Sequence, residues 1–289
     1  MTLIVRQLVE TDLDWAAAVL AATGLSARQP ELRRYLALEP AGYYAADVDG
    51  RPAGLGGYVA YETFAFVGNM AVAQEFQGRG AGRTILTRLL EDVEGRGIPA
   101  TLLEATPEGE RLYRTCGFLD AHWTMAYTRT AGQTGVCGAG GVAVGPLRAA
   151  DLDDVTAFDA PRFGAPRRRV IERFLRDYPG RGVLARLPGG GVAGYLIAQA
   201  RILGPWLADD GETAGALLEA ALALPFDGAP VAFAPEPNAA AATLFARFGF
   251  TAHWESLRMR RESAGGSAAG AGPVGRPGCV YGMAALAIG

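Results

Sequence analysis

Lysine is absent from this sequence, and all 27 basic residues are arginines. A chain without lysine cannot form a lysine Schiff base, and it cannot use the lysine of a P-loop to hold a nucleotide phosphate.

Cysteine, histidine and long apolar runs are scarce as well. Cys116, Cys137 and Cys279 are odd in number and widely spaced, so we expect reduced thiols and no metal site. The N-terminus lacks the basic and apolar regions of a signal peptide, and no run reaches the roughly 18 apolar residues of a membrane span. A net charge of −3 gives no reason to expect nucleic acid or a membrane as partner. We expect a cytoplasmic protein.

What the sequence does contain is a repeat on the scale of a domain. LVETDLDWAAAV (8–19) resembles LRAADLDDVTAF (147–158), and RLYRTCGF (111–118) resembles TLFARFGF (243–250). In the first pair of segments, the matching residues Asp12 and Asp151 are 139 positions apart. In the second pair, the matching residues Gly117 and Gly249 are 132 positions apart. A nearly constant separation over several elements indicates a tandem duplication of one fold.

Each copy alternates strand-like and helix-like segments, which predicts an α/β sheet covered by helices. We expect a first domain over residues 1–129 and a second over 142–262. The Gly-rich segment 130–141 between them has the composition of a linker. Residues 263–289 begin with a second Gly-rich stretch and end in an apolar tail, which should dock onto the second domain or across the interface.

The segment QGRGAG (77–82) stands between a strand-like and a helix-like run. Its glycines allow successive N–H groups to converge on one point, and the helix that follows adds unpaired N–H groups and the positive end of its dipole. Arg79 and Arg83 add positive charge. The junction predicts a site for a phosphate or pyrophosphate.

Two other interpretations of this junction remain. In the first, the glycines only form an ordinary tight turn before the helix and bind no ligand. A dinucleotide fingerprint, G-x-G-x-x-G, needs glycine where Arg83 stands, and Glu104 near the position of a ribose-binding acid is its only support.

The surrounding residues resemble a known family. MAVAQEFQGRGAGRTIL is similar to the acetyl-CoA-binding motif of the GNAT superfamily of N-acetyltransferases, in which Q/R-x-x-G-x-G/A follows a strand. LYRTCGF resembles the family's later Tyr-x-x-x-Gly-Phe pattern and places Tyr113 at its tyrosine. The resemblance covers most of residues 1–128. It implies two tandem GNAT-like domains, each a splayed, mixed and mostly antiparallel sheet flanked by helices.

The resemblance also implies acetyl-CoA as co-substrate, with its pantetheine arm along the strand before the glycines. In many family members an Asn follows the next strand, whereas Thr106 is nearest to that position here. The residues implied to bind the co-substrate are Met70, Ala71, Val72, Gln77, Gly78, Arg79, Gly80, Ala81, Gly82, Arg83 and Thr106.

The implied reaction is transfer of the acetyl group to an amine by direct attack. An alkyl amine with a pKa near about 10 is mostly protonated at neutral pH, so a base or a water relay must accept a proton. Glu104, at the end of its strand, is the candidate base, and a carboxylate that only caps the strand end is the alternative. The resemblance gives Tyr113 the task of protonating the departing thiolate.

The second copy lacks the residues of this chemistry. DGETAG (210–215) stands where QGRGAG stands in the first copy, so Asp210 and Glu212 replace a glutamine and an arginine, and Thr213 replaces a glycine. Phe245 replaces the tyrosine. Because acidic residues repel a pyrophosphate, we predict that the second domain keeps the fold and has lost acetyl-CoA binding.

The sequence says less about the acceptor than about the acetyl donor. A small-molecule amine is the favoured acceptor, and a peptide N-terminus is the alternative. A protein that senses acyl-CoA without catalysis is a third hypothesis, and a homodimer is compatible with the sequence.

Overall fold

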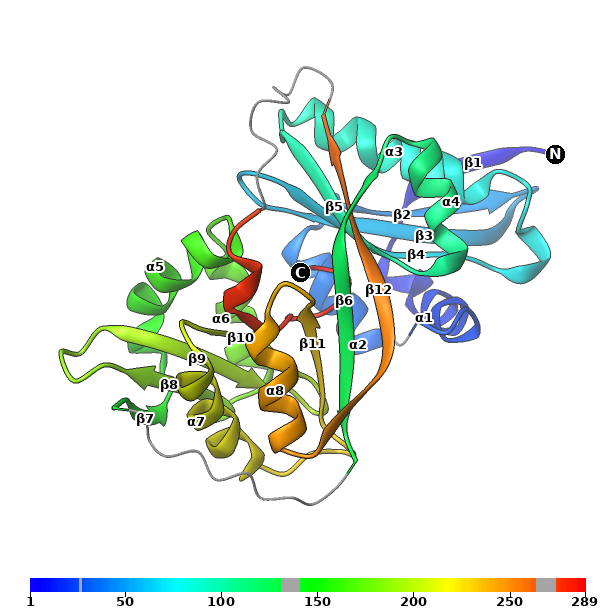
Figure 1. The fold of residues 1–289 in the computed structure, drawn as a ribbon. Helices are drawn as coiled ribbons and strands as arrows, with labels where there is room; N and C mark the ends of the chain where they lie inside the picture. Colours follow the sequence, from blue (N-terminus) through cyan, green and yellow to red (C-terminus); the bar gives the residue numbers. More distant parts are fainter. Residues whose placement is uncertain (26–27, 131–140, 264–273) are drawn as a thin grey trace. The chain divides into compact units, whose positions relative to one another are not determined.

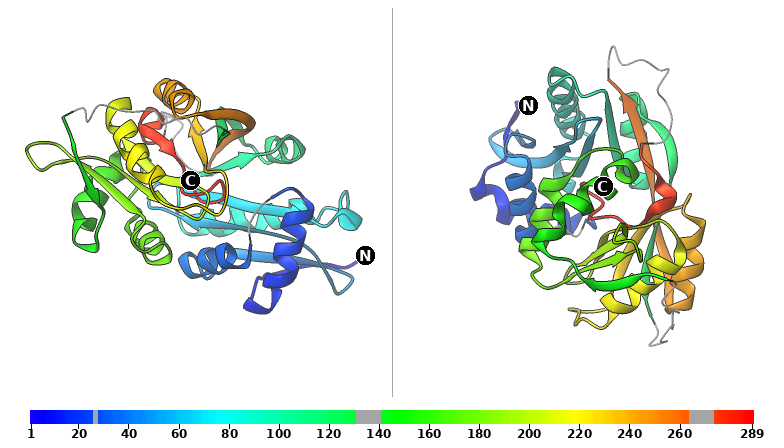
Figure 2. Two further views of the ribbon diagram at one scale, coloured as in Figure 1. Left: turned by 90° about the horizontal axis from the view of Figure 1, so that it is seen from below. Right: turned by 90° about the vertical axis from the view of Figure 1, so that its left-hand side faces the viewer.

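The structure is a computed structural model that describes residues 1–25, 28–130, 141–263 and 274–289 (Figures 1 and 2). The chain divides into two compact units. Unit 1 holds residues 1–120, 259–263 and Ile288. Unit 2 holds the described residues of 121–258 and 274–287, together with Gly289.

Unit 1 is a sheet with helices, and its strands follow the order β1-β2-β3-β4-β5, with the end of β12 beside β5. The pairs β1–β2, β2–β3 and β3–β4 are antiparallel, and β4–β5 is parallel. Its elements are β1 (Leu3–Gln7), α1 (Leu13–Ala22), α2 (Gln29–Leu38), β2 (Tyr43–Val48), β3 (Arg51–Ala60), β4 (Ala65–Val72), α3 (Ala81–Gly95), β5 (Ala100–Ala105) and α4 (Pro107–Thr115).

Glycines on β3 set the spacing between the sheet and its two covering layers. A Cβ at Gly56 would collide with the side chain of Ile85 on α3. On the opposite face, a Cβ at the next residue, Gly57, would collide with the ring of Tyr43, which stacks on Tyr35 of α2 at 6.2 Å. Because side chains alternate along a strand, α2 and α3 cover opposite faces of the sheet.

Unit 2 contains a second sheet, with the strand order β13-β10-β9-β8-β7. All of its recorded pairs are antiparallel. Its elements are β7 (Ala143–Pro146), α5 (Leu152–Phe163), α6 (Arg168–Asp177), β8 (Gly182–Arg186), β9 (Val192–Ala198), β10 (Leu203–Ala208), α7 (Gly211–Leu222), α8 (Ala239–Arg247) and β13 (Val280–Gly282). The apolar tail supplies β13, which pairs with β10, and Tyr281 packs on Trp206 there.

Unit 2 also contains one further strand and parts of two others. The strand is β11 (Val231–Pro235), and the parts are residues 121–129 of β6 (Leu119–Arg129) and residues 250–258 of β12 (Phe250–Glu262). Because most of β6 lies in unit 2 and β12 ends in unit 1, the limits of the two units differ from the predicted domain limits at 129 and 142. Most of the predicted linker 130–141 and most of the Gly-rich stretch that begins at residue 263 lie outside the described residues, as does Cys137.

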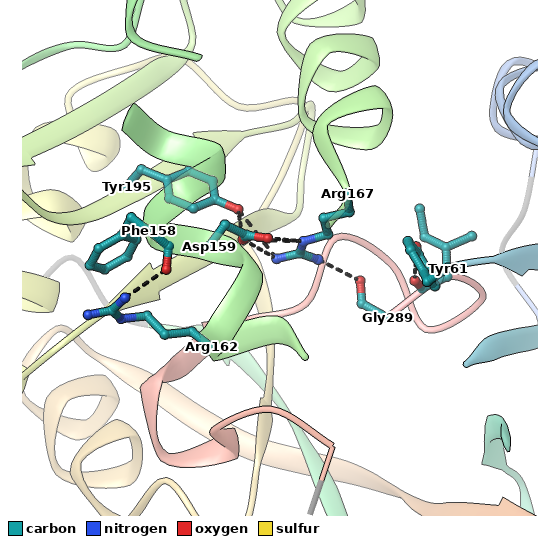
Figure 3. A network of polar contacts seen from close by, with 8 residues as sticks. Tyr61, Phe158, Asp159, Arg162, Arg167, Tyr195 and Gly289 are labelled. Atoms are coloured by element: carbon teal, nitrogen blue, oxygen red, sulfur yellow. Dashed lines mark hydrogen bonds and ion pairs between the residues drawn. The ribbon is translucent and has the colours of Figure 1, made fainter. Parts of the chain in front are cut away.

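A buried polar network holds α5 and α6 together within unit 2 (Figure 3). The guanidinium of Arg167 donates to both carboxylate oxygens of Asp159 at 2.9 Å, and the two side chains are 2% and 1% exposed. Tyr195 on β9 donates its hydroxyl to the same carboxylate at 2.5 Å, and Arg167 also donates to the backbone oxygen of Gly289. Every charge in this network is therefore paired away from water.

In the described parts of the chain, no helix combines the length and the hydropathy needed to cross a membrane.

Candidate active site

The strands β4 and β5 separate halfway along β4. The recorded parallel pairing joins Ala65–Val67 to Thr101–Leu103 and does not extend to residues 68–72, all of which the structure describes. Backbone groups on this edge of β4 are therefore not used by β5, and a chain-like ligand could take the place of the missing strand pairing. The splayed sheet that the sequence resemblance implies is confirmed.

A bulge bends β4 at the point where it leaves β5. Asn69 has a φ of +54°, and the register of β3 with β4 shifts between Leu55 and Gly57. The side chain of Met70 fills the space that a Cβ at Gly56 would need. The three predicted strand residues Met70, Ala71 and Val72 lie on the part of β4 that does not pair with β5. Met70 and Val72 are half-buried, and Ala71 is buried. The sequence prediction missed Asn69, although Asn is one of the few residues that tolerate a positive φ.

The loop after β4 is an uncapped helix start. Gly78 and Gly80 have φ values of +74° and +88°, with open space where a Cβ would lie, so they are glycines for their backbone conformation. Helix α3 begins at Ala81, and none of the described side chains caps it. The N–H groups of its first turn have no acceptor within the helix, so they remain available to an anion. We call this loop, residues 77–83, the cradle.

The side chains of the cradle have different contacts. Gln77 donates to the backbone oxygen of Val72 at 3.1 Å, which ties the cradle to the end of β4. Arg83 donates to the hydroxyl of Thr115 at the end of α4, at 2.9 Å. The guanidinium of Arg79 lies 5.7 Å from the centre of the Phe76 ring. Only Arg79 has its charge directed to an aromatic face, and Phe76 was not predicted from the sequence.

Tyr113 lies on α4, and its side chain is buried, with 7% of the residue exposed. Its ring lies against Gly109, one turn earlier on α4, and contacts Phe118 edge to face at 5.9 Å. Burial raises the pKa of the Tyr113 phenol well above its usual value of about 10. A phenol with a raised pKa stays protonated at neutral pH, so Tyr113 has a proton to donate and does not act as a base.

The two remaining predicted residues lie at the carboxyl end of β5. Glu104 is half-buried on β5. Thr106 is the N-cap residue of α4, but its side chain makes no capping bond, and its backbone oxygen accepts from Gly109 at 2.9 Å. The structure thus places Glu104 and Thr106 at the end of the strand that separates from β4.

In unit 2 the strand-to-helix junction before α7 carries carboxylates that already bond to protein groups. Asp210 caps α7 by accepting from the N–H of Thr213 at 2.7 Å, and Asp209 accepts from Arg162 at 2.8 Å. Phe245, in the position of the tyrosine, is fully buried against Trp206. The carboxylate of Asp210 occupies the N-terminus of α7, where the cradle of unit 1 has no capping group.

A pocket of about 450 Å³ borders this second junction. Its wall includes Asp210 and Glu212 on α7 and Arg247 on α8. Among the residues that the structure describes, no cluster of three or more His, Cys, Asp or Glu side chains could hold a metal ion.

Comparison with protein families gives two matches, one in each half of the chain. The acetyltransferase (GNAT) family matches residues 11–118, which include β4, the cradle and α4. A second acetyltransferase (GNAT) domain family matches residues 155–268. Together the two matches cover more than half of the chain. No curated protein matches it.

Solved structures share the fold over almost the whole chain. A Pyrococcus horikoshii protein assigned to the acetyltransferases is 24% identical, with a TM-score of 0.82 over 99% of this chain and 96% of that one. A GCN5-related N-acetyltransferase from Sphaerobacter thermophilus is 18% identical, with a TM-score of 0.67 over 92% and 97%. A tandem GNAT protein from the clavulanic acid biosynthesis pathway is 14% identical, with a TM-score of 0.65 over 91% and 99%. The predicted fold class is confirmed.

Proposed function

The chain belongs to the GNAT superfamily of acetyltransferases, whose general reaction is acyl transfer, and from that premise we propose that its first GNAT region transfers acetyl from acetyl-CoA to a small-molecule amine. One observation carries this assignment. Helix α3 has an uncapped N-terminus preceded by two left-handed glycines, and this loop follows the stretch of β4 that does not pair with β5. An anion site and an open strand edge are what a pyrophosphate with an extended pantetheine arm requires.

The residues of the site divide the work between binding and proton transfer. The N–H groups of the cradle hold the pyrophosphate, with Arg79 and Arg83 at its rim, and residues 70–72 of β4 with Thr106 flank the arm. The amine nitrogen attacks the thioester carbon and the carbon–sulfur bond breaks. Glu104, directly or through water, takes the proton that the amine loses, and Tyr113 donates its phenol proton to the thiolate.

Positioning supplies most of the rate in such a transfer. Holding the amine and the thioester in reacting geometry is worth up to about 7–11 kcal/mol, which exceeds what one proton donor contributes. A rigid platform is therefore more important than a strong base. The bulge at Asn69 and the tie between Gln77 and Val72 fix the two ends of the part of β4 that does not pair with β5.

We infer that the second GNAT region does not bind acetyl-CoA. Asp210 already satisfies the N-terminus of α7, and a pyrophosphate would have to displace this carboxylate and then face Glu212. Two negative charges at about 4 Å repel by about 4 kcal/mol at the effective dielectric of a protein surface. Phe245 cannot replace the phenol of Tyr113.

The first test is a calorimetric titration of the purified full chain with acetyl-CoA. We expect one site per chain, because one junction is uncapped and the other is closed by Asp210. Two sites per chain would contradict the assignment of the second region. No binding at high micromolar ligand would refute the proposed function. Thiol release with a panel of small amines then identifies the acceptor, and release only with peptide N-termini would exclude the small-molecule acceptor.

Gly80→Glu should weaken acetyl-CoA binding about 100-fold, since it adds a carboxylate and a strained φ to the cradle. The matched control is Gly190→Glu in the β8–β9 hairpin of unit 2. Gly190 has the same φ of +88° and the same open space around a Cβ, so it carries the same strain away from the cradle. If the two variants bound acetyl-CoA with equal affinity in the same titration, the cradle would not be part of the binding site.

A further inference from the structure

Two arginines share one aromatic ring beside the cradle. Phe76 is 5% exposed and packs with Val48 and Ala53. The guanidinium of Arg51, at the start of β3, lies 5.1 Å from the centre of this ring, and that of Arg79 lies 5.7 Å from it. A fixed aromatic face attracts and orients a cation, so a buried Phe76 holds both charges in place. Arg51 and Arg79 are 28 positions apart in the sequence, and the fold brings both of them to the same ring.

These charges are poorly neutralised. The one recorded carboxylate near Arg51 is Glu75 at 3.7 Å, and both side chains are more than half exposed. Arg79 has no carboxylate partner within the described ranges. Elsewhere in unit 1, the ion pairs Arg6–Asp12 and Arg96–Glu39 are 2.7 and 2.8 Å long. Two like charges on one ring with a weak counter-charge form a local positive potential that favours an anion.

We propose that Arg51 and Arg79 form a second anion site, which takes the 3′-phosphate of CoA; the inference rests on the proposed function. Acetyl-CoA carries a pyrophosphate and, on its ribose, a phosphate monoester. The N–H groups of the cradle take the pyrophosphate, and the arm follows β4 away from the loop. The ribose end then extends from the loop toward solvent, and the side chains of Arg51 and Arg79 are both exposed beside the loop.

The charge of the monoester fits two arginines better than one. A phosphate monoester carries about −1.5 to −2 charges at neutral pH, and each guanidinium can bind its oxygens with two parallel N–H donors. Arg83 is less suited to this task, because its guanidinium is already directed to Thr115 on α4. Arg51 is thus a specificity residue outside the sequence motif of the cradle.

The experiment compares acetyl-CoA with acetyl-3′-dephospho-CoA by calorimetry. We expect the unmodified protein to prefer acetyl-CoA about 10-fold or more, which corresponds to about 1.4 kcal/mol. Arg51→Ala should weaken acetyl-CoA binding several-fold and leave the affinity for the dephospho ligand unchanged, so the preference falls to what Arg79 alone supports. Arg51→Lys should keep more of the preference. The control is Arg33→Ala, which removes an exposed arginine of α2 paired with Glu10 and should keep the full preference.

The outcomes separate this inference from the proposed function. Equal affinity of the unmodified protein for both ligands, or an equal loss for both ligands in Arg51→Ala, would overturn the 3′-phosphate site and leave the acetyl-CoA site standing. Failure of the unmodified protein to bind either ligand would overturn both. Thermal unfolding of each variant identifies a general loss of structure, which would lower both affinities together.

Discussion

Tyr113→Phe is expected to leave the Kd for acetyl-CoA unchanged and to lower kcat by about 100-fold or more. The substitution removes one hydroxyl from a ring that Gly109 and Phe118 hold in place, so the packing of α4 should persist. The departing thiolate, with a pKa of about 8.5, then loses its donor, and general acid catalysis contributes about 10²- to 10⁴-fold. Calorimetry gives the Kd, and thiol release at saturating amine gives kcat.

The pH dependence gives a second check on the same residue. Burial raises the pKa of Tyr113, so its proton remains bound while the solution passes from about pH 7 to pH 9.5. The kcat of the unmodified protein should therefore not fall over this range. A fall there that Tyr113→Phe abolishes would mean that the phenol titrates too early to act as proposed.

The matched control is Tyr127→Phe in unit 2. Burial also raises the pKa of Tyr127, whose ring stacks on Phe245 at 4.5 Å, but Tyr127 is outside the proposed site. Its loss should leave kcat unchanged. An undiminished kcat in Tyr113→Phe would make Tyr113 a packing residue only, and it would favour a protein that senses acyl-CoA without using this residue.

Local chemistry explains why the cradle could be predicted from the sequence. A positive φ and a helix start depend on neighbouring residues, and Gly78, Gly80 and the start of α3 at Ala81 follow the expected pattern. The turn at Asp49-Gly50 depends on the same local chemistry, since both residues have a positive φ. The negative charge of DGETAG was equally visible, although the cap made by Asp210 itself was not predicted.

Distant pairing could not be predicted in this way. The local pattern of β12 does not reveal that its end lies beside β5, and the local pattern of β6 does not reveal that most of it lies in unit 2, because strand partners are determined by the whole fold. For the same reason the role of Arg51 could not be predicted, since the ring that it contacts, Phe76, lies 25 positions later in the sequence. The bulge at Asn69 left only a weak signal, an Asn within an apolar strand.

The largest effect on stability is expected at Arg167 in unit 2. Arg167→Ala should lower the free energy of unfolding by about 3–5 kcal/mol, because it leaves the carboxylate of Asp159 buried without its counter-charge. The hydroxyl of Tyr195 still donates to this carboxylate, but one neutral donor does not replace a bidentate guanidinium. Urea unfolding, followed by a probe in unit 2, measures the change.

The neighbouring residue provides the control for this experiment. Arg168 is 47% exposed and pairs with Asp153 and Glu172 at the surface, so Arg168→Ala should leave the unfolding midpoint almost unchanged. The double variant Asp159→Leu/Arg167→Met should recover part of the loss, since it removes the buried carboxylate that Arg167→Ala leaves without its guanidinium. It should not recover all of the loss, because the hydroxyl of Tyr195 and the oxygen of Gly289 lose their partners. Equal effects of Arg167→Ala and Arg168→Ala would contradict the structure, because they would place Arg167 at the surface, where solvent and not Asp159 compensates its charge.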